Sequence, residues 1–441
     1  MIRASEIKRS LGKIALLFVS MIGSAFLAFL SQMFLGRILP VSEFGTITTA
    51  LSFFSIAAAI TSFGIPGFWL LCFGKEGWNG HRWIKPSIQT IIAILPLVIG
   101  LLWLYILIFV ENTKLPFVVA WFHGLIIMQV VIDLLGAKLQ LEGKYKSLSV
   151  WQIAAQLSRL IVVMAAYFFD LLDVIYIAAG FSFASIIISV LALIELKKIS
   201  FSAFVLSGHG NKPAEISYQK TSIKHVFLEA WPFAATAGLV MLYGRIEVVL
   251  LGTLTGVESA GIYSVAIAFL LVAFLIPQAI FQKFLLPKIH RWYNQDMKRF
   301  IAVYKFNCAA MLTIGIAGSI IVYLLAEPLV TFVFGNKYLY SAKILSLLSI
   351  CIVLRFISTC VGSTLISGEN MRRKVYCQIV VAFISITVAS LCISNFGIQG
   401  AIFSKIITEL SLMLLYLYAS TKHVLGHDAW QGWSLRFEKN A

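Results

Sequence analysis

The chain alternates between long apolar runs and short polar segments. Twelve of the runs reach the ~20 residues that a helix needs to cross the hydrocarbon core of a membrane. These runs are 14–35, 44–72, 87–110, 116–138, 147–169, 173–195, 225–251, 260–286, 302–325, 342–367, 375–394 and 397–420. Backbone groups find no water in lipid, and the ~10-residue alternation of barrel strands is not visible, so the runs are expected to be helices. The pattern predicts an all-α integral membrane protein.

The basic residues predict the orientation of these spans. If the N-terminus is inside, every inner segment carries at least three Lys or Arg, whereas the outer loops hold only Arg37, Lys114, Lys337 and Lys343. Cytoplasmic loops are enriched in Lys and Arg in this way. We therefore predict that both termini are cytoplasmic and that residues 14–35 are a retained first helix, since this run is too long for a signal peptide.

The two halves of the chain have similar sequence features. Leu35-Gly36 aligns with Leu251-Gly252, and Gly45 aligns with Gly261. We predict two pseudo-symmetric six-helix lobes around a central cavity, as in several transporter folds. The predicted boundaries are an N-terminal lobe at 1–195, a cytoplasmic linker at 196–224, a C-terminal lobe at 225–420 and a cytoplasmic tail at 421–441.

The composition excludes a soluble protein. Only 12% of the 441 residues are charged and 60% are apolar, whereas soluble domains carry about 25% charged residues. The net charge of +16 resides mainly in loops, unlike the concentrated basic face of a nucleic-acid-binding protein. The six cysteines are scattered, so neither a disulfide framework nor a metal site is expected.

Seven ionisable residues within the spans are the candidates for function. An ionisable side chain at the membrane centre costs roughly 2.5–3.5 kcal/mol on insertion scales. The basic candidates suit an anionic head group, because Arg grips phosphate oxygens bidentately. They are Arg159, Arg245, Arg355 and Lys405. The acidic candidates, for ion coupling, are Glu247, Asp133 and Glu409.

A structural role for these charges is the alternative. Each charge can be paired with a neighbour or can extend to an interface. Lys405 and Glu409 are four residues apart on one helix face and can neutralise each other. Arg245 and Glu247 are two apart and need separate partners.

Common motifs of nucleotide hydrolysis, serine hydrolases and metalloproteases are absent from the sequence. There is no Walker A loop, no GxSxG and no HExxH, and the outer loops are all short. We expect no enzymatic activity and no cofactor.

Several loose motifs carry a resemblance to a known family. In the first half they are Leu35-Gly36-Arg37 with Glu43-Phe44-Gly45, and Phe63-Gly64-Ile65-Pro66. In the second half they are Arg245-Ile246-Glu247 and Gly261-Ile262-Tyr263-Ser264. With these motifs the chain resembles the Wzx-type O-antigen flippases of the multidrug/oligosaccharidyl-lipid/polysaccharide exporter superfamily.

The resemblance implies a function and a location. The substrate would be an undecaprenyl-diphosphate-linked oligosaccharide repeat unit, moved from the cytoplasmic to the periplasmic leaflet of the bacterial inner membrane by alternating access. A proton or sodium gradient acting through Glu247, Asp133 or Glu409 would drive this movement. Partners would be the lipid-linked oligosaccharide, membrane lipid and a glycan polymerase complex, with no nucleic acid.

Three other functions stay open. A multidrug antiporter of the same superfamily would bind cations, but the charges in the spans are mostly basic here. A membrane-embedded glycan polymerase or ligase, or a scaffold protein, are the others. Loss of a flippase traps lipid-linked units on the cytoplasmic leaflet, whereas loss of a polymerase leaves single units displayed outside.

Overall fold

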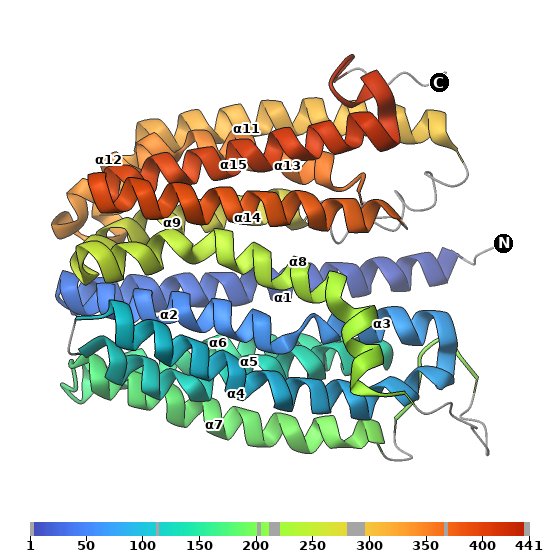
Figure 1. Cartoon of the computed structure of the whole chain (residues 1–441), viewed down its shortest axis with the longest axis horizontal. Helices are drawn as coiled ribbons and strands as arrows, with labels where there is room; N and C mark the ends of the chain where they lie inside the picture. Colours follow the sequence, from blue (N-terminus) through green and yellow to red (C-terminus); the bar gives the residue numbers. More distant parts are fainter. Residues whose placement is uncertain are drawn as a thin grey trace. The chain divides into compact units, whose positions relative to one another are not determined.

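The computed structural model describes residues 4–111, 114–200, 204–210, 221–279, 296–365 and 369–435, and all regular secondary structure in these ranges is helical (Figure 1). The helices up to the middle of the chain are α1 (Ala4–Ile38), α2 (Val41–Ser62), α3 (Ile65–Glu76), η1 (Gly77–Trp83), α4 (Ile84–Phe109), α5 (Lys114–Leu141), α6 (Tyr145–Phe168), α7 (Val174–Lys197), η2 (Lys198–Ser200) and α8 (Ile223–Leu250). Those that follow are η3 (Leu251–Thr255), α9 (Val257–Ala279), α11 (Met297–Phe334), η5 (Asn336–Tyr338), α12 (Leu339–Leu348), α13 (Ile350–Gly362), α14 (Glu369–Phe396), α15 (Ile398–Ser420), η6 (Thr421–Leu425) and η7 (Gly426–Ala429).

The predicted all-α membrane fold is confirmed, and each of the twelve predicted spans overlaps a helix. Among the described residues, ten helical stretches are long and apolar enough to cross a membrane, or eleven if α12 and α13, bent by 46°, count as one. One of the ten, Val41–Phe109, has 69 residues and overlaps two predicted spans, 44–72 and 87–110. This length is enough for two crossings, since ~20 residues suffice for one. Residues 280–286 of the predicted span 260–286 lie outside the described part.

The chain forms two compact units that divide within α8. Unit 1 is Met1–Arg245 and unit 2 is Ile246–Ala441. This division lies beyond the predicted linker at 196–224, because the start of α8 packs in unit 1: the Phe227 ring lies 4.8 Å from that of Phe63. Of the linker, 201–203 and 211–220 lie outside the described residues, as do 436–441 of the predicted tail. The two six-helix lobes stay a prediction.

Ion pairs join the predicted outer loops of unit 1. The Lys114 ammonium lies 2.7 Å from a carboxylate oxygen of Glu43 and 3.2 Å from one of Asp173. Asp173 also accepts a hydrogen bond from the Ile175 N–H and caps α7. The Ile175 bond and Lys114 lower the pKa of the Asp173 carboxyl below its ordinary value. Three predicted outer segments thus meet at one end of unit 1.

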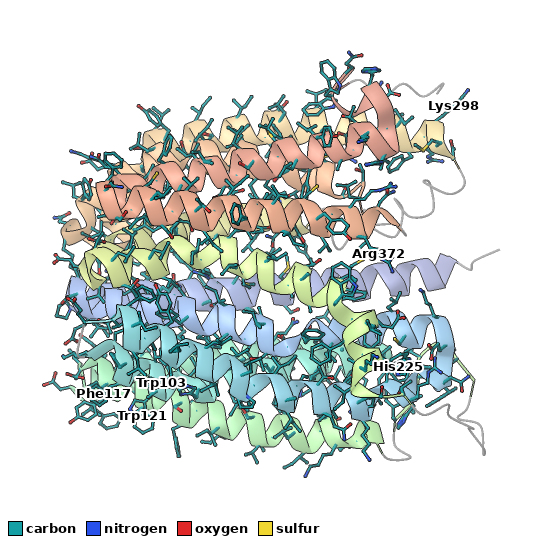
Figure 2. The ribbon with its side chains drawn as sticks, viewed as in Figure 1. Trp103, Phe117, Trp121, His225, Lys298 and Arg372 are labelled. Atoms are coloured by element: carbon teal, nitrogen blue, oxygen red, sulfur yellow. The ribbon has the colours of Figure 1, made fainter. Side chains whose placement is uncertain are left out.

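Exposed aromatic side chains lie at this same end. Figure 2 shows Trp103, Phe117 and Trp121 together there, whereas His225 lies at the opposite end of unit 1. Phe117 and Trp121 are exposed. Aromatic residues concentrate at membrane–water boundaries, so this end of unit 1 is suited to such a boundary.

The predicted inner segments of unit 1 meet at the other end. The Trp78 indole donates to the Gly210 carbonyl at 2.8 Å, and Thr221 donates to the Arg82 carbonyl at 2.7 Å. The Ser207 N–H donates to the Leu141 carbonyl. The alternation of loops predicted from Lys and Arg is therefore found in unit 1, while the side of the membrane stays a prediction.

Predicted inner segments of unit 2 also meet at one end. At the predicted inner end, Tyr304 donates to the Ala429 carbonyl at 2.6 Å and Lys305 pairs with Asp428 at 2.6 Å. Lys298 and Arg372 lie at one end of the unit 2 helices (Figure 2). The start of α11 is thus bound to the segment that follows α15.

A sharp break separates α2 from α3. Phe63 and Gly64 both have left-handed backbone conformations, with φ of 47° and 61°. A Cβ atom at Gly64 would lie 2.3 Å from the carbonyl carbon of Phe233 in α8. Glycine therefore serves two purposes here, since it permits the positive φ and the close approach of α8.

We expect a cysteine introduced at Glu258 to react with an impermeant maleimide in intact cells. A cysteine at Lys146 should react only after the membrane is opened, because the two residues lie on opposite predicted sides of the membrane. Both positions are exposed. The background is a variant whose six native cysteines are replaced by alanine. Labelling of both positions in intact cells would contradict the predicted topology.

Gly64→Ala should destabilise the protein, because an L-residue in the left-handed region costs about 1–2 kcal/mol and the Cβ would clash with α8. A fall of the thermal unfolding temperature in detergent, by a few degrees, is the expected result. Gly74→Ala is the matched control, since a Cβ there meets no atom within 4 Å. Equal unfolding temperatures for the two variants would refute the explanation of the break.

Candidate functional site

Four of the seven candidate residues form one charged cluster in unit 2. Arg355 of α13 donates to the Glu409 Oε1 of α15 at 2.5 Å. The Lys405 ammonium, one turn before Glu409, lies 3.7 Å from the same oxygen. It also lies 3.9 Å from Oε1 of Glu247 in α8. Two acids and two bases from three helices are thus brought together.

The cluster is almost completely buried. The side chains of Glu247, Lys405 and Glu409 are exposed by 1%, 3% and 0%, and that of Arg355 by 13%. The Arg355 guanidinium also lies over the Phe274 ring, 4.9 Å from its centroid, a favourable cation–π arrangement. Because charges interact strongly away from water, the balance of two positive and two negative groups is what makes their burial tolerable.

Hydrogen bonds satisfy the two carboxylates only in part. Among the described residues, Oε1 of Glu247 and Oε2 of Glu409 have no hydrogen-bond partner. Glu409 is held by both cations, whereas Glu247 is held by the longer contact to Lys405. Glu247 is therefore the less firmly paired of the two acids.

Arg159 has different surroundings in unit 1. Its guanidinium lies over the Phe54 ring, 5.2 Å from the centroid, and donates to the Gln156 side chain at 3.5 Å. Its Nε and Nη2 atoms are buried without a hydrogen-bond partner among the described residues. No acidic side chain of the described part of the chain pairs with it. Its remaining donors are thus available to an anion.

The other two candidates of unit 1 are not in a cluster. The Gln129 amide donates to the Asp133 carboxylate at 2.9 Å within α5. Arg245 is partly buried on α8, and no hydrogen bond or ion pair joins it to another described residue. Both residues are half-buried, and their predicted roles stay predictions.

The geometry separates the four predicted head-group cations into two kinds. Arg355 and Lys405 are paired with acids, which agrees with the structural role that the sequence left open as an alternative. They therefore differ from cations whose donors are available to an anionic head group. Arg159 and Arg245 have no acidic partner in the described part. Pairing of Lys405 with Glu409 was predictable from their spacing, but the approach of Arg355 and Glu247 was not, since they come from other helices.

Sequence reasoning missed a second charged cluster, built around the buried Lys138 at the predicted inner end of unit 1. Lys138 is completely buried and lies 2.9 Å from Glu195 and 3.5 Å from Glu142. Lys144 pairs with Glu142, and Lys198 pairs with Glu195. The predicted span 116–138 ends at Lys138, and its spacing of four from Glu142 was the signal available. This cluster connects α5 to α7.

Comparison with known proteins indicates the family. A family model described as "Polysaccharide biosynthesis protein" matches residues 10–293. The chain is 24% identical over 214 residues to the capsular polysaccharide biosynthesis protein CapF of Staphylococcus aureus. This match covers 48% of the chain and 54% of CapF, so the chain spans about half the length of this relative.

Solved structures share the fold. The lipid II flippase MurJ in an inward closed conformation has a TM-score of 0.65 at 12% identity, covering 92% of this chain and 87% of MurJ. The eukaryotic MATE transporter AtDTX14 has a TM-score of 0.64 at 15% identity, covering 96% and 97%. At these identities the likeness establishes the fold alone. The superfamily resemblance predicted from the motifs is confirmed.

Arg355→Met should lower the stability of the protein, because it leaves Glu409 with less compensation in a buried site. Breaking a buried pair costs about 3–5 kcal/mol, and the thermal unfolding temperature in detergent measures the loss. The double variant Arg355→Met/Glu409→Gln restores the charge balance and should recover part of the loss. Lys298→Met, at an exposed position, is the control, with an expected change within ~0.5 kcal/mol. A double variant less stable than Arg355→Met would contradict the neutral cluster.

Proposed function

We propose that this chain, which belongs to the polysaccharide biosynthesis protein family, moves lipid-linked oligosaccharides across a membrane. The substrate in this proposal is an undecaprenyl-diphosphate-linked repeat unit of the O-antigen type. It moves from the cytoplasmic to the periplasmic leaflet of the bacterial inner membrane, while the binding site opens to the two sides in turn. No catalytic step on the sugar is part of the proposal.

The surroundings of Arg159 carry this proposal. A diphosphate cannot enter hydrocarbon unaided, because burial of an unpaired charge is very costly. A buried guanidinium whose Nε and Nη2 lack hydrogen-bond partners among the described residues offers the donors that phosphate oxygens require. Since Gln156 and the Phe54 ring are its only described contacts, binding an anion would break no ion pair of the described structure.

The paired cluster of unit 2 fits a different task. Arg355 and Lys405 would have to leave their acids before they could bind a substrate. We assign this cluster to ion coupling, with Glu247 as the exchanging carboxylate and Glu409 as the fixed one. Asp133, which has an amide neighbour only, is a second coupling candidate.

The names of the relatives support the substrate class. CapF is named for capsular polysaccharide biosynthesis, and MurJ is named a lipid II flippase. The fold is shared with multidrug transporters of the MATE family as well, so fold likeness does not separate the two functions. The family match, and the absence of an acidic partner of Arg159 among the described residues, favour an anionic, lipid-linked substrate over a cationic drug.

Arg159→Gln should slow flipping by roughly 10- to 100-fold at an unchanged protein level, because a charge-assisted hydrogen bond is worth about 1.5–3 kcal/mol. Arg159→Lys should be intermediate, since it keeps the charge but loses the bidentate geometry. Lys146→Gln, an exposed position on the same helix, is the control for loss of one positive charge.

The readout is the accumulation of lipid-linked repeat units on the cytoplasmic leaflet of a flippase-null strain that carries each variant. A panel of such strains, making either capsule or O-antigen units, identifies the repeat unit through recovery of surface polysaccharide. Full activity of Arg159→Gln would remove the head-group role of this residue. Single units displayed outside a strain that lacks the gene would indicate a polymerase instead.

A further inference from the structure

The Lys405 ammonium lies between two buried carboxylates of different helices. Its Nζ atom is 3.9 Å from Glu247 of α8 and 3.7 Å from Glu409 of α15. We propose that Lys405 is a built-in cation that occupies the place of a free alkali-metal ion, so that the site exchanges protons and does not bind Na⁺. This inference rests on the proposed ion coupling and names the coupling ion.

Charge balance carries the first step. With Arg355 and Lys405 positive and Glu247 and Glu409 negative, the cluster is neutral. A Na⁺ ion bound by both carboxylates would give a buried net charge of +1, and it would lie within a few ångströms of the ammonium. Both effects are unfavourable in a site away from water. A proton raises the same net charge, but it forms a covalent O–H bond with one oxygen and needs no second ligand.

The second step concerns which carboxylate takes the proton. A proton on Glu409 would weaken two ion pairs, those to Arg355 at 2.5 Å and to Lys405 at 3.7 Å. A proton on Glu247 would weaken one ion pair, its contact to Lys405 at 3.9 Å. The proton therefore goes to Glu247, whose Oε1 has no hydrogen-bond partner among the described residues.

The groups around Glu247 agree with this assignment. The titratable or charged side chains that interact with it are Tyr263 of α9, Cys351 and Arg355 of α13, and Lys405 and Glu409 of α15. Only Glu409 among them is a carboxylate, and it is already held by two cations. Protonation of Glu247 would release the ion pair that joins α8 to α15, while the ion pair of Lys405 with Glu409 would stay.

The third step is what happens when the ammonium is removed. A shortened, neutral side chain at 405 leaves two carboxylates facing a space that the lysine had filled. Hard cations bind to oxygen ligands of this kind. Na⁺ can then restore the lost positive charge, so the variant should gain a sodium site that the natural protein lacks.

The test measures thermal unfolding of the purified full-length protein in detergent, in NaCl and in choline chloride at equal ionic strength. For the natural protein we expect the same unfolding temperature in NaCl as in choline chloride. Lys405→Ala should be less stable in choline, and Na⁺ should raise its unfolding temperature saturably by about 3 °C or more. Lys305→Ala, which removes an ion pair to Asp428 near the chain end, is the control and should show no Na⁺ effect.

Two outcomes would overturn the proposal. One is a saturable stabilisation of the natural protein by Na⁺, which decides the question even if no Lys405 variant folds. The other is a folded Lys405→Ala that is indifferent to Na⁺. The double variant Lys405→Ala/Glu247→Gln should lose the stabilisation by Na⁺, which places the ion at Glu247.

None of these measurements uses flipping, so they stay informative if the proposed transport activity fails. A flipping assay driven by an imposed proton or Na⁺ gradient tests that activity separately.

Discussion

The hydrocarbon core of a membrane provides no hydrogen-bond partner and does not solvate charge, and the rest of this structure follows from that constraint. Backbone groups must be satisfied within each segment, so the apolar runs become helices. Ionisable side chains must be paired, satisfied by a ligand, or moved to the ends of the helices. The two units of this protein meet these demands in different ways.

Unit 2 pairs its buried charges with one another. Arg355 and Lys405 face Glu409, and Lys405 also faces Glu247. Such a cluster can be kept at depth because its charges cancel, but a change of protonation at one member alters all its contacts. Unit 1 instead keeps Arg159 on an aromatic ring with one weak amide contact. A cation in that condition has donors left for an anionic ligand. In the function that we propose, binding of the head group and coupling to an ion are therefore carried by different parts of the chain.

The ends of unit 1 use ion pairs as well, but for connection. Lys114 joins the starts of α2, α5 and α7 at one end, and the cluster around Lys138 connects α5 to α7 at the other. The break at Gly64 lets α8 approach α2 and α3 closely. This approach at Gly64 explains why the start of α8 belongs to unit 1, although the sequence places the linker before it.

The sequence alone determined that this is a helical membrane protein, where its spans lie, and which loops share an end of the helices. It could do so because a run of ~20 apolar residues and the distribution of Lys and Arg are local properties of a chain. The motifs also identified the superfamily. The sequence also supplied all seven candidate residues, since an ionisable residue within an apolar span is easily recognised. Only the tertiary structure decided which of them are neutralised. The contact of Lys405 with Glu409 follows from one helical turn, whereas the contacts with Arg355 and Glu247 depend on how three helices pack, and no spacing along the chain encodes that. For the same reason the sequence did not show that Lys138, at the end of a predicted span, is buried against Glu142, which follows α5, and Glu195 of α7.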